Sequence, residues 1–419
     1  MISRSSLSVR WAIGGVAIFI VTAFLLLRGQ HRSYKSQYES IVKSMHHTKL
    51  FDDVYNSTLG FEKIFVVGLP SRTDRRDNII LQASISNIEV EFIDGVKGAD
   101  VAENAIPMDE EGIKLKPANI GSWRAHMNAV QEIIRQNLTS ALILEDDVDW
   151  DIRLKEQLAD FALSTRALIQ PLRSSSGGKT YADPTYPRPP PGAPTAVPDL
   201  DLHNLPAVVP PTASPYGDGW DALWIGNCGL SFPYLDSDEI PKGRVIHGDD
   251  VTVPPKKDLW SFNKPFLLVD DYPEHTRAVF HAQEGLCTLG YALSQDGARK
   301  LLYEVALKPP TVPYDFLLRY YCDGTYGRRR NNCLGVQPAL FHHFLMAGPL
   351  NASSDIGTWD GWRNESESDM IRWSVRLNAD KLMNGETDFV DQYPDEEVKG
   401  EGEGEGKEAS DSLFDISES

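Results

Sequence analysis

The stretch from Ala141 to Trp150 constrains the fold of this chain more than any other. It begins with four apolar residues, which are typical of a buried strand, and ends with Glu145, Asp146, Asp147 and, one residue later, Asp149. An α/β sheet delivers acidic groups in this way to the crevice at the carboxyl ends of its strands. Carboxylates this close repel one another unless a cation lies among them, and hard oxygen ligands favour Mg²⁺ or Mn²⁺ shared with phosphates. A solvated acidic loop after a strand is the alternative interpretation.

The segments before this stretch alternate between strand-like and helix-like patterns. Residues 63–69 form a β-rich run that Pro70 stops, residues 79–85 have helical spacing, and residues 90–93 are a second strand-like run. Residues 117–136 carry apolar side chains three to four positions apart, which predicts a helix with one buried face. Strand, helix and strand in this order predict a doubly wound α/β sheet.

The chain after the acidic strand changes character and then returns to ordered patterns. Residues from about 171 to 215 are rich in proline, which predicts an irregular insertion rather than a domain. Further ordered runs are expected at 220–226, 264–270 and 287–294 (strands), 295–302 (helix), 313–317 and 337–343. A single catalytic domain is therefore expected from residue 59 to residue 395.

The amino terminus is expected to anchor the chain in a membrane. Residues 11–27 are an uncharged apolar run, at the short end of what spans a bilayer, and no small-x-small cleavage site follows them. This favours a single-pass type II signal anchor, with residues 1–10 in the cytosol and a polar stem at 28–58. The body would then lie in the lumen of the Golgi or the endoplasmic reticulum. Four N-glycosylation sequons agree with that compartment, and they begin at Asn56, Asn137, Asn351 and Asn364.

Charge and cysteine content narrow the class of protein. The formal net charge of −19 argues against nucleic-acid binding, which needs a basic surface. Residues 396–419 are acidic and poor in large apolar groups, which predicts a disordered tail. A disulfide between Cys322 and Cys333 would leave Cys228 and Cys287 as a second pair, and four free thiols are the alternative.

Two further arrangements bear on chemistry. Arg72, Arg75 and Arg76 follow the first strand, where guanidinium groups suit phosphate or carboxylate recognition, although they are also common at the surface of a helix start. His342 and His343 end a β-like run, where a neutral imidazole completes a carboxylate metal site or simply packs in the core. The chain has no GxxxxGK[ST] loop, no GxGxxG after the first strand and no nucleophile elbow.

Several short motifs occur in a fixed order along the chain. They are Lys63-Ile-Phe-Val-Val-Gly-Leu-Pro-Ser-Arg-Thr-Asp-Arg-Arg76, Phe92-Ile-Asp-Gly-Val-Lys-Gly98, Gly121-Ser-Trp-Arg-Ala-His126, Leu144-Glu-Asp-Asp-Val148, Gly290-Tyr-Ala-Leu-Ser294 and Pro313-Tyr-Asp315. This set resembles glycosyltransferase family 25, which includes bacterial lipooligosaccharide and animal collagen galactosyltransferases. The resemblance covers about 60–150 and 220–345. Ser122 and Ala125 replace the family's usual Cys and Ser, and Gly68 stands where Asn is common, which indicates drift in packing, a changed acceptor or weakened activity.

The resemblance implies a GT-A-type, Rossmann-like mixed sheet flanked by helices. It also implies transfer of a sugar, galactose, from a UDP-sugar to a hydroxyl of a glycan, protein or lipid, with inversion and with Mn²⁺ (or Mg²⁺). Asp147, Asp146 and His343 are the expected metal ligands. Arg72, Arg75, Asp94, Glu145 and Asp146 are expected to contact the nucleotide sugar.

The same resemblance points to the groups that would act on the acceptor. His126 would orient the site, or else be a histidine at the edge of the core. Asp315 is the expected base that deprotonates the acceptor hydroxyl, with Glu284 and Asp296 as substitutes, although Asp315 can also cap a helix after Pro313.

Two other functions compete with transfer. One is a catalytically inactive luminal binding protein on the same fold. The other is a metal-dependent phosphohydrolase, for which His247, Asp249 and Asp250 would supply a second ligand cluster.

Overall fold

The computed structural model describes residues 49–396, except 111, 113, 114, 175, 176, 178, 179 and 358. The expected cytosolic segment at 1–10, the anchor at 11–27, most of the stem and nearly all of the acidic tail lie outside the described residues. Over the part of the chain that is described, no helix has the length and apolar character needed to cross a membrane.

A mixed sheet forms the centre of the fold. Among the described residues it contains nine strands in the order β2-β1-β3-β11-β6-β12-β9-β8-β5. Their bounds are β1 Lys63–Gly68, β2 Glu91–Asp94, β3 Ser140–Glu145, β5 Leu200–Asp201, β6 Ala222–Gly226, β8 Arg244–His247, β9 Arg277–His281, β11 Gly290–Ser294 and β12 Cys333–Gln337. Strands β2, β1 and β3 are parallel, whereas β11 runs antiparallel to β3. The predicted mixed α/β sheet is confirmed.

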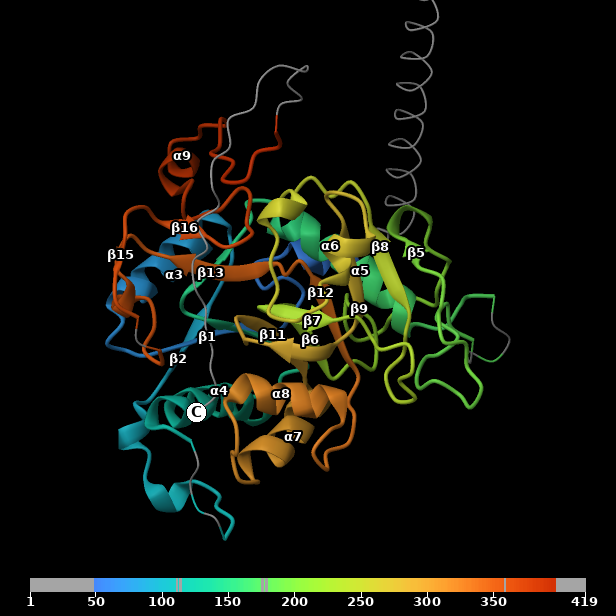
Figure 1. Ribbon diagram of the computed structural model, residues 1–419, viewed down its shortest axis with the longest axis horizontal. Coiled ribbons are helices and arrows are strands. Elements are labelled where there is room, and N and C mark those ends of the chain that lie inside the picture. Colours follow the sequence, from blue (N-terminus) through green and yellow to red (C-terminus); the bar gives the residue numbers. More distant parts are fainter. Residues whose placement is uncertain are drawn as a thin grey trace, which may run out of the picture.

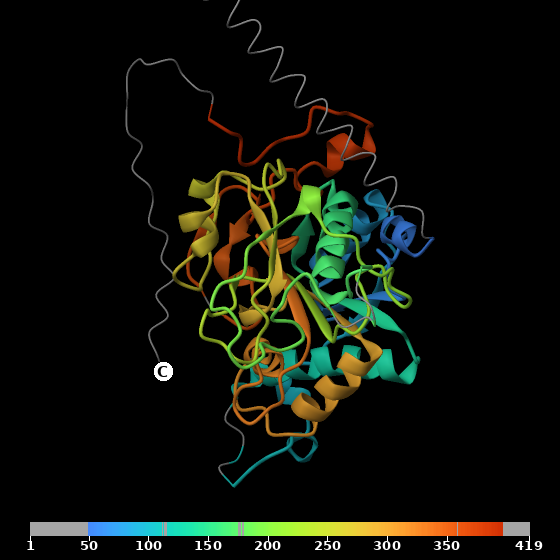
Figure 2. The same ribbon diagram turned by 90° about the vertical axis from the view of Figure 1, so that its right-hand side faces the viewer.

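Helices cover both faces of this sheet. Helices α4 (Pro117–Arg135), α7 (Gln295–Leu301) and α8 (Tyr314–Asp323) lie together below the sheet in Figure 1, whereas α3 (Thr73–Ile85) and α5 (Leu154–Ile169) lie above it. The view turned by 90° in Figure 2 again places the teal α4 below the strands and the green α5 above them. The protein is therefore a three-layer α/β/α structure.

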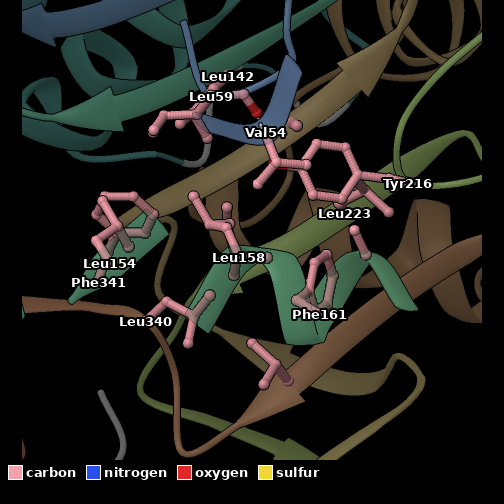
Figure 3. Packing of buried hydrophobic residues seen from close by; sticks show 14 of the residues in the cluster. Val54, Leu59, Leu142, Leu154, Leu158, Phe161, Tyr216, Leu223, Leu340 and Phe341 are labelled. Atoms are coloured by element: carbon pink, nitrogen blue, oxygen red, sulfur yellow. Dashed lines mark hydrogen bonds between the residues drawn. The ribbon is translucent and has the colours of Figure 1, made fainter. Parts of the chain in front are cut away.

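The alternation of side chains along each strand builds one core on each face. On β3, Leu142 packs in the cluster that includes α5, whereas Ile143 packs in the cluster that includes α4. Figure 3 shows Leu158 and Phe161 of α5 on the side of the helix that faces Val54 and Tyr216, and the ring centroids of Phe161 and Tyr216 lie 5.9 Å apart. Complete burial of a leucine or phenylalanine side chain contributes about 1.5–3 kcal/mol, so these two clusters hold the acidic strand firmly in place.

Part of the segment assigned to the stem is packed into the core. Helix α2 (Lys49–Asp52) and the 3₁₀ helix η1 (Asp53–Tyr55) carry Phe51 and Val54, whose side chains are buried. Val54 lies beside Tyr216 in Figure 3, and the Tyr216 hydroxyl donates to the Leu59 carbonyl at 2.6 Å. The folded part thus begins earlier than expected, because two isolated apolar residues in a polar segment show no period.

The strand predicted at residues 264–270 is wrong. Helix α6 (Leu267–Asp271) occupies most of this segment, and its Leu268 is buried together with Phe266, the residue before the helix. Pro265 has no N–H to donate to a strand ladder. A short apolar run of this kind does not reveal its structure by periodicity, and tertiary packing decides it.

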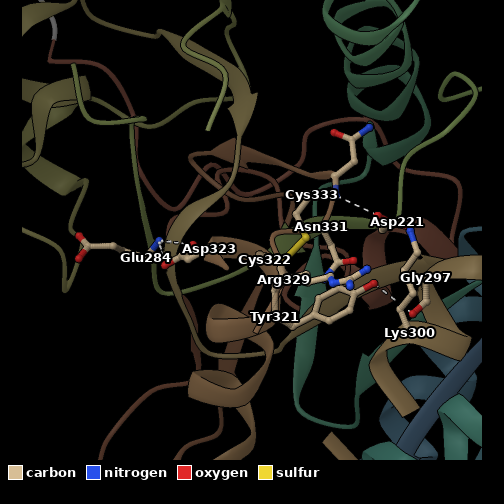
Figure 4. The surroundings of a disulfide bond; sticks show 11 residues. Asp221, Glu284, Gly297, Lys300, Tyr321, Cys322, Asp323, Arg329, Asn331 and Cys333 are labelled. Carbon is tan, nitrogen blue, oxygen red and sulfur yellow. Dashed lines mark hydrogen bonds and ion pairs between the residues drawn. A yellow bond between two sulfur atoms is a disulfide. The ribbon is translucent and has the colours of Figure 1, made fainter. Parts of the chain in front are cut away.

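The proline-rich insertion lies along the far edge of the sheet. Its short strand β5 pairs in parallel with β8, and the described residues between 171 and 215 include no α-helix. Both expected disulfides are present, Cys228–Cys287 and Cys322–Cys333. In Figure 4, the second of these joins the end of α8 to the start of β12.

Smaller elements complete the described part. Strands β4 (Val148–Trp150), β13 (Phe341–Leu345) and β16 (Glu367–Ser368) form a small sheet, β7 (Gly229–Ser231) pairs with β10 (Gln283–Leu286), and β14 (Gly348–Pro349) pairs with β15 (Trp362–Arg363). The remaining helices are η2 Gly98–Asp100, η3 Glu103–Ala105, η4 Leu202–Asn204, η5 Lys256–Asp258, the π-helical η6 Leu302–Ala306, η7 Leu350–Ala352 and α9 Ala379–Met383. Strand β13 pairs with β4 directly after the acidic residues, so the carboxyl-terminal part of the chain crosses the end of β3.

Candidate active site

The acidic residues stand at one edge of the sheet because neighbouring parallel strands end together there. Val67 of β1 pairs with Glu145 of β3, and Gly68 pairs with Asp94 of β2. Asp146 and Asp147 follow immediately. We refer to this region, Gly68 with residues 145–147, as the acidic corner.

Arg75 ties the acidic corner to helix α3. Its Nη1 lies 2.6 Å from Asp146 Oδ1 and 3.1 Å from Asp147 Oδ2, and its Nη2 donates to the Ser353 carbonyl at 2.7 Å. The Asp146 side chain is almost fully buried. Three of the residues expected to form one site, Arg75, Asp146 and Asp147, are therefore in direct contact.

The two aspartates of the corner differ in their tendency to hold a proton. Burial, together with the charge of Asp147, raises the pKa of Asp146 even though Arg75 opposes the shift. Burial also disfavours the charged form of Asp147, but the positive groups of Arg75, His343 and Arg376 outweigh it and lower the pKa of Asp147. Of the two aspartates, Asp147 is therefore the one that stays charged to lower pH.

Asp147 has an oxygen available for a cation. Its Oδ1 is buried and has no hydrogen-bond partner among the described residues, which is costly for a charged group. No group of three or more His, Cys, Asp or Glu side chains in the described part is arranged to hold a metal ion by itself. Mg²⁺ and similar ions are commonly held by one or two carboxylates together with substrate phosphates and water, and the corner fits a shared ion of that kind.

The other residues that were expected to bind the nucleotide or the metal also lie near the corner, some buried and some exposed. Arg72 donates to Asp74 and, at 2.6 Å, to Asp355, and it also reaches the Ala352 carbonyl. His343 lies on β13 opposite Val148, close enough to affect the charge of Asp147. Asp94 lies at the same edge, but its exposed carboxylate pairs with Arg76.

A buried polar network extends from Glu145 into the layer below the sheet. Glu145 Oε1 accepts from the Thr288 hydroxyl at 2.7 Å and lies 3.5 Å from His126 Nε2. The His126 ring stacks on Tyr314 at 4.3 Å between centroids, and its Nδ1 lies 3.1 Å from the Tyr291 hydroxyl. His126 is thus fully buried and touches a carboxylate of the corner, so it is more than a histidine at the edge of the core.

Asp315 approaches the same network from the first turn of α8. Its Oδ2 accepts from the Cys287 backbone N–H at 3.2 Å, one residue before Thr288, and its Oδ1 accepts from the Phe316 N–H at 2.9 Å. Burial raises the pKa of Asp315, and the nearby charge of Glu145 raises it further, although the two backbone donors act in the opposite direction. A carboxylate with this shift is a better proton acceptor than an ordinary aspartate.

The two substitutes for Asp315 are placed very differently. Asp296 follows Ser294, which pairs with Ser140 at the opposite edge of the sheet, and it pairs with Arg299 at the surface. Asp296 therefore lies far from the acidic corner. The sequence alone does not show this position, because it depends on the antiparallel direction of β11, which only the folded structure reveals. Glu284 lies on β10, three residues before Cys287.

Comparison with known proteins finds similarity to glycosyltransferases. The family model described as glycosyltransferase family 25 (LPS biosynthesis protein) matches residues 61–184, which contain Arg75 and the acidic corner. Procollagen galactosyltransferase 1 of Danio rerio is 28% identical over 328 residues, which are 74% of this chain and 40% of that protein. Procollagen galactosyltransferase 1-B of Xenopus laevis is 26% identical over 77% of this chain and 43% of its own length.

The chain is similar to glycosyltransferase family 25 over residues 61–184 and to two procollagen galactosyltransferases over most of its length. It spans about 40% of the length of the two procollagen galactosyltransferases. The human inactive glycosyltransferase 25 family member 3 is also similar, at 26% identity over 24% of this chain and 19% of that protein.

One departure of this chain from the usual pattern of glycosyltransferase family 25 has a structural explanation. A Cβ atom added at Gly68 would lie 2.1 Å from Asp146 Oδ2, so any side chain at that position would displace the carboxylate that holds Arg75. Asp146 therefore occupies the space that the usual asparagine would need. Nothing in the structure explains the replacements at Ser122 and Ala125.

Sequence reasoning misses a second guanidinium at the corner. Arg376 Nη2 donates to the Asp146 carbonyl at 3.4 Å and its Nε donates to Gln82 at 2.7 Å. Asp149, by contrast, is not part of the corner, because its buried carboxylate accepts hydrogen bonds from Gln82 and Ser374 instead. Arg376 is 230 positions from Asp146 in the sequence, and a local sequence pattern cannot predict a contact over that separation.

The cluster considered for a phosphohydrolase is occupied by an internal ion pair. Asp250 Oδ2 lies 2.6 Å from Arg277 Nε, and Thr252 also donates to its carboxylate. Four strands separate β8, which ends at His247, from β3. These residues therefore do not join the acidic corner.

Proposed function

We propose that this protein transfers galactose from UDP-galactose to a hydroxyl of an acceptor, with a divalent cation as cofactor. The observation that carries the proposal is the unpaired, buried Oδ1 of Asp147 beside Arg75, at the carboxyl ends of parallel strands. Crevices at that edge of an α/β sheet are where such folds bind nucleotides. The name of the Danio rerio relative supports galactose as the sugar.

Arg72 and Arg75 would bind the diphosphate. Both guanidinium groups now donate to backbone carbonyls of one loop, Ala352 for Arg72 and Ser353 for Arg75. Phosphate oxygens are stronger acceptors with the same geometry, and guanidinium groups bind them in pairs. Asp146 would keep Arg75 in position through their 2.6 Å contact.

Mn²⁺ or Mg²⁺ would be held by Asp147, with Asp146 and His343 nearby, and would supply positive charge to the departing diphosphate. Two guanidinium groups of the chain would add positive charge for the same diphosphate. Arg75 contacts Asp147 directly, and Arg376 lies near enough for its charge to act on Asp147. Glu145 lies on the other side of the corner, where Thr288 and His126 hold its carboxylate. In this arrangement Asp147 would bind the cation and Glu145 would lie next to the sugar.

Asp315 would serve as the general base. Its carboxylate would accept the proton of the acceptor hydroxyl while that oxygen forms a bond to the anomeric carbon and the carbon–phosphate oxygen bond breaks. One displacement of this kind inverts the configuration at the anomeric carbon. Asp315 is connected to the corner through Cys287 and Thr288, so the base and the donor lie in adjoining parts of the site.

We further propose that the protein acts in the lumen of the Golgi or the endoplasmic reticulum, held by residues 11–27. The two disulfides support an oxidising compartment. All four sequon asparagines are exposed, as glycosylation requires, and they are Asn56, Asn137, Asn351 and Asn364.

Release of UDP tests the transfer reaction. The full chain is incubated with UDP-galactose, Mn²⁺ and a panel of neutral methyl glycosides, and UDP is measured over time. We expect acceptor-dependent release that disappears in Asp315→Asn, whereas that variant still binds UDP with Mn²⁺. Release that persists in Asp315→Asn at the rate of the unchanged protein would remove Asp315 from the mechanism.

A second candidate function is binding of a nucleotide sugar without turnover. The loop at 350–357 already satisfies Arg72 and Arg75, with Asp355 paired to Arg72, and a similar human protein is named as inactive. UDP binding that depends on Mn²⁺, without UDP release for any acceptor in the panel, would favour this candidate over the transferase.

A further inference from the structure

A cavity of about 460 Å³ lies beside the proposed base. Its walls are the loop after β7, strand β10, helix α8 and the turn that follows α8. Phe316, next to Asp315, is one of its lining residues. Cavities of about 300–1,000 Å³ are the usual size for small-ligand sites.

Three tyrosines give this pocket flat aromatic surfaces. Tyr326 is 75% exposed and Tyr234 is 47% exposed, although both carry large apolar rings. The Tyr320 and Tyr326 rings lie 4.0 Å apart between centroids, which extends the surface. Exposed aromatic groups gathered in one concave site indicate a ligand that packs on their faces while hydroxyl groups stay hydrated.

Glu284 is held rigidly in the wall of the pocket. Arg319 donates to its Oε1 at 2.6 Å, and the hydroxyls of Ser231 and Tyr234 donate to its Oε2. Its backbone has φ of 55°, and the pairing of β10 with β7 shifts register at this point. Such bulges and left-handed residues cost energy and are concentrated at functional sites, where they direct a side chain.

The pocket has more lining carboxylates than lining cations, which disfavours anionic ligands. Its lining carboxylates are Asp238, Glu239, Glu284 and Asp323, against the single lining cation Arg319. Arg188 pairs with Glu239 from outside, which leaves the site acidic. A phosphate or carboxylate ligand would therefore be repelled, and so would the diphosphate of the donor.

The wall of the pocket and the candidate active site share strand β10 and helix α8. The Glu284 backbone N–H donates to Asp323, and Figure 4 shows both residues on the same side of the disulfide that fixes the end of α8. Three residues later, the Cys287 N–H donates to Asp315. Phe316 of the pocket wall directly follows the proposed base, so the two sites are neighbours.

We propose that this pocket binds the acceptor of the transfer reaction, and that the acceptor is an uncharged saccharide. The apolar C–H face of a pyranose packs on Tyr326 and Tyr234, and its hydroxyls donate to Glu284. The role as acceptor rests on the proposed function, whereas saccharide binding rests on the pocket alone.

Saturation-transfer NMR with the full chain tests the proposal. The probes are the methyl glycosides of galactose, glucose, mannose and N-acetylglucosamine, with a glycoside 6-phosphate as the anionic comparison. We expect at least one neutral glycoside to bind, and Tyr326→Ala to weaken its binding by about fivefold or more. Tyr303→Ala is the matched control, because Tyr303 is 59% exposed and is not among the residues that line the pocket.

Binding of UDP with Mn²⁺ is measured on the same samples to separate the two claims. Sugar binding that fails for all four glycosides, or that Tyr303→Ala weakens as much as Tyr326→Ala, would overturn the saccharide pocket. Binding of only the 6-phosphate would overturn it as well. Intact sugar binding without any UDP binding would instead overturn the transferase and leave the saccharide site in place.

Discussion

Replacing Arg75 by methionine removes the cation that holds the acidic corner together. In the folded protein, its guanidinium contacts Asp146 at 2.6 Å and Asp147 at 3.1 Å, and all three side chains are largely buried. Removing one partner of a buried ion pair leaves an uncompensated charge, which typically costs about 3–5 kcal/mol. We expect a loss of this size in the free energy of unfolding at pH 8.

The loss should depend on pH in a defined direction. Without Arg75, the pKa of Asp146, already raised by burial and by Asp147, rises further, and the pKa of Asp147 rises too. The folded variant then binds protons that the unfolded chain has released, so its stability falls as pH increases through the folded pKa. At pH 5 the loss should be smaller by at least about 1.4 kcal/mol, the equivalent of one pKa unit.

Urea unfolding followed by tryptophan fluorescence measures both quantities, since Trp150 is buried directly after the acidic corner. Arg72→Met is the matched control. Arg72 pairs with Asp74 and Asp355, whose side chains are 43% and 42% exposed, and surface pairs contribute about 0–1 kcal/mol. A loss below about 1 kcal/mol for Arg75→Met, equal at pH 5 and pH 8, would contradict the role given to Arg75.

Two other substitutions test separate parts of the structure. Burial raises the pKa of Asp323 to about 7, so its folded carboxyl binds a proton between about pH 4 and pH 7 that the unfolded chain lacks, and stability should fall as pH rises through this range. Asp323→Asn should flatten that pH dependence in urea unfolding, and an unchanged slope would contradict it. Gly68→Ala should weaken binding of UDP with Mn²⁺ by about tenfold or more, because its Cβ displaces Asp146. Gly248→Ala is the control, because a Cβ added at Gly248 has no atom within 4 Å, and this variant should bind UDP with Mn²⁺ normally. Equal binding by the two variants would contradict the displacement of Asp146 by a side chain at position 68.

The acidic corner is the part of the site that the sequence predicts best. A buried strand that ends in Glu145 and two aspartates is a local pattern, and Arg75 follows the neighbouring strand by only a few residues. Because β1 and β3 are parallel neighbours, both segments end at one edge, and local pattern is enough to bring them together. The sequence also points to His126, although its contact with Glu145 requires the structure.

The rest of the site depends on contacts between distant parts of the chain. Arg376 and the loop that carries Ser353 reach the corner only because the chain crosses the end of β3 after β13, and no local pattern predicts that path. The pocket beside Asp315 arises from a bulge at Glu284 and from tyrosines in separate loops. Sequence reasoning misplaces Asp296 for the same reason, since the direction of β11 decides which edge it occupies.

Calorimetric titration of UDP into the full chain, with and without Mn²⁺, tests the central claim most directly. The claim is that Asp147 holds a cation shared with the diphosphate of the donor. We predict binding that requires Mn²⁺ and that is lost in Asp147→Asn, while the variant keeps the urea unfolding curve of a folded protein. Equal binding with and without Mn²⁺, or Mn²⁺-dependent binding that survives in Asp147→Asn, would contradict the assignment of the acidic corner as the donor site.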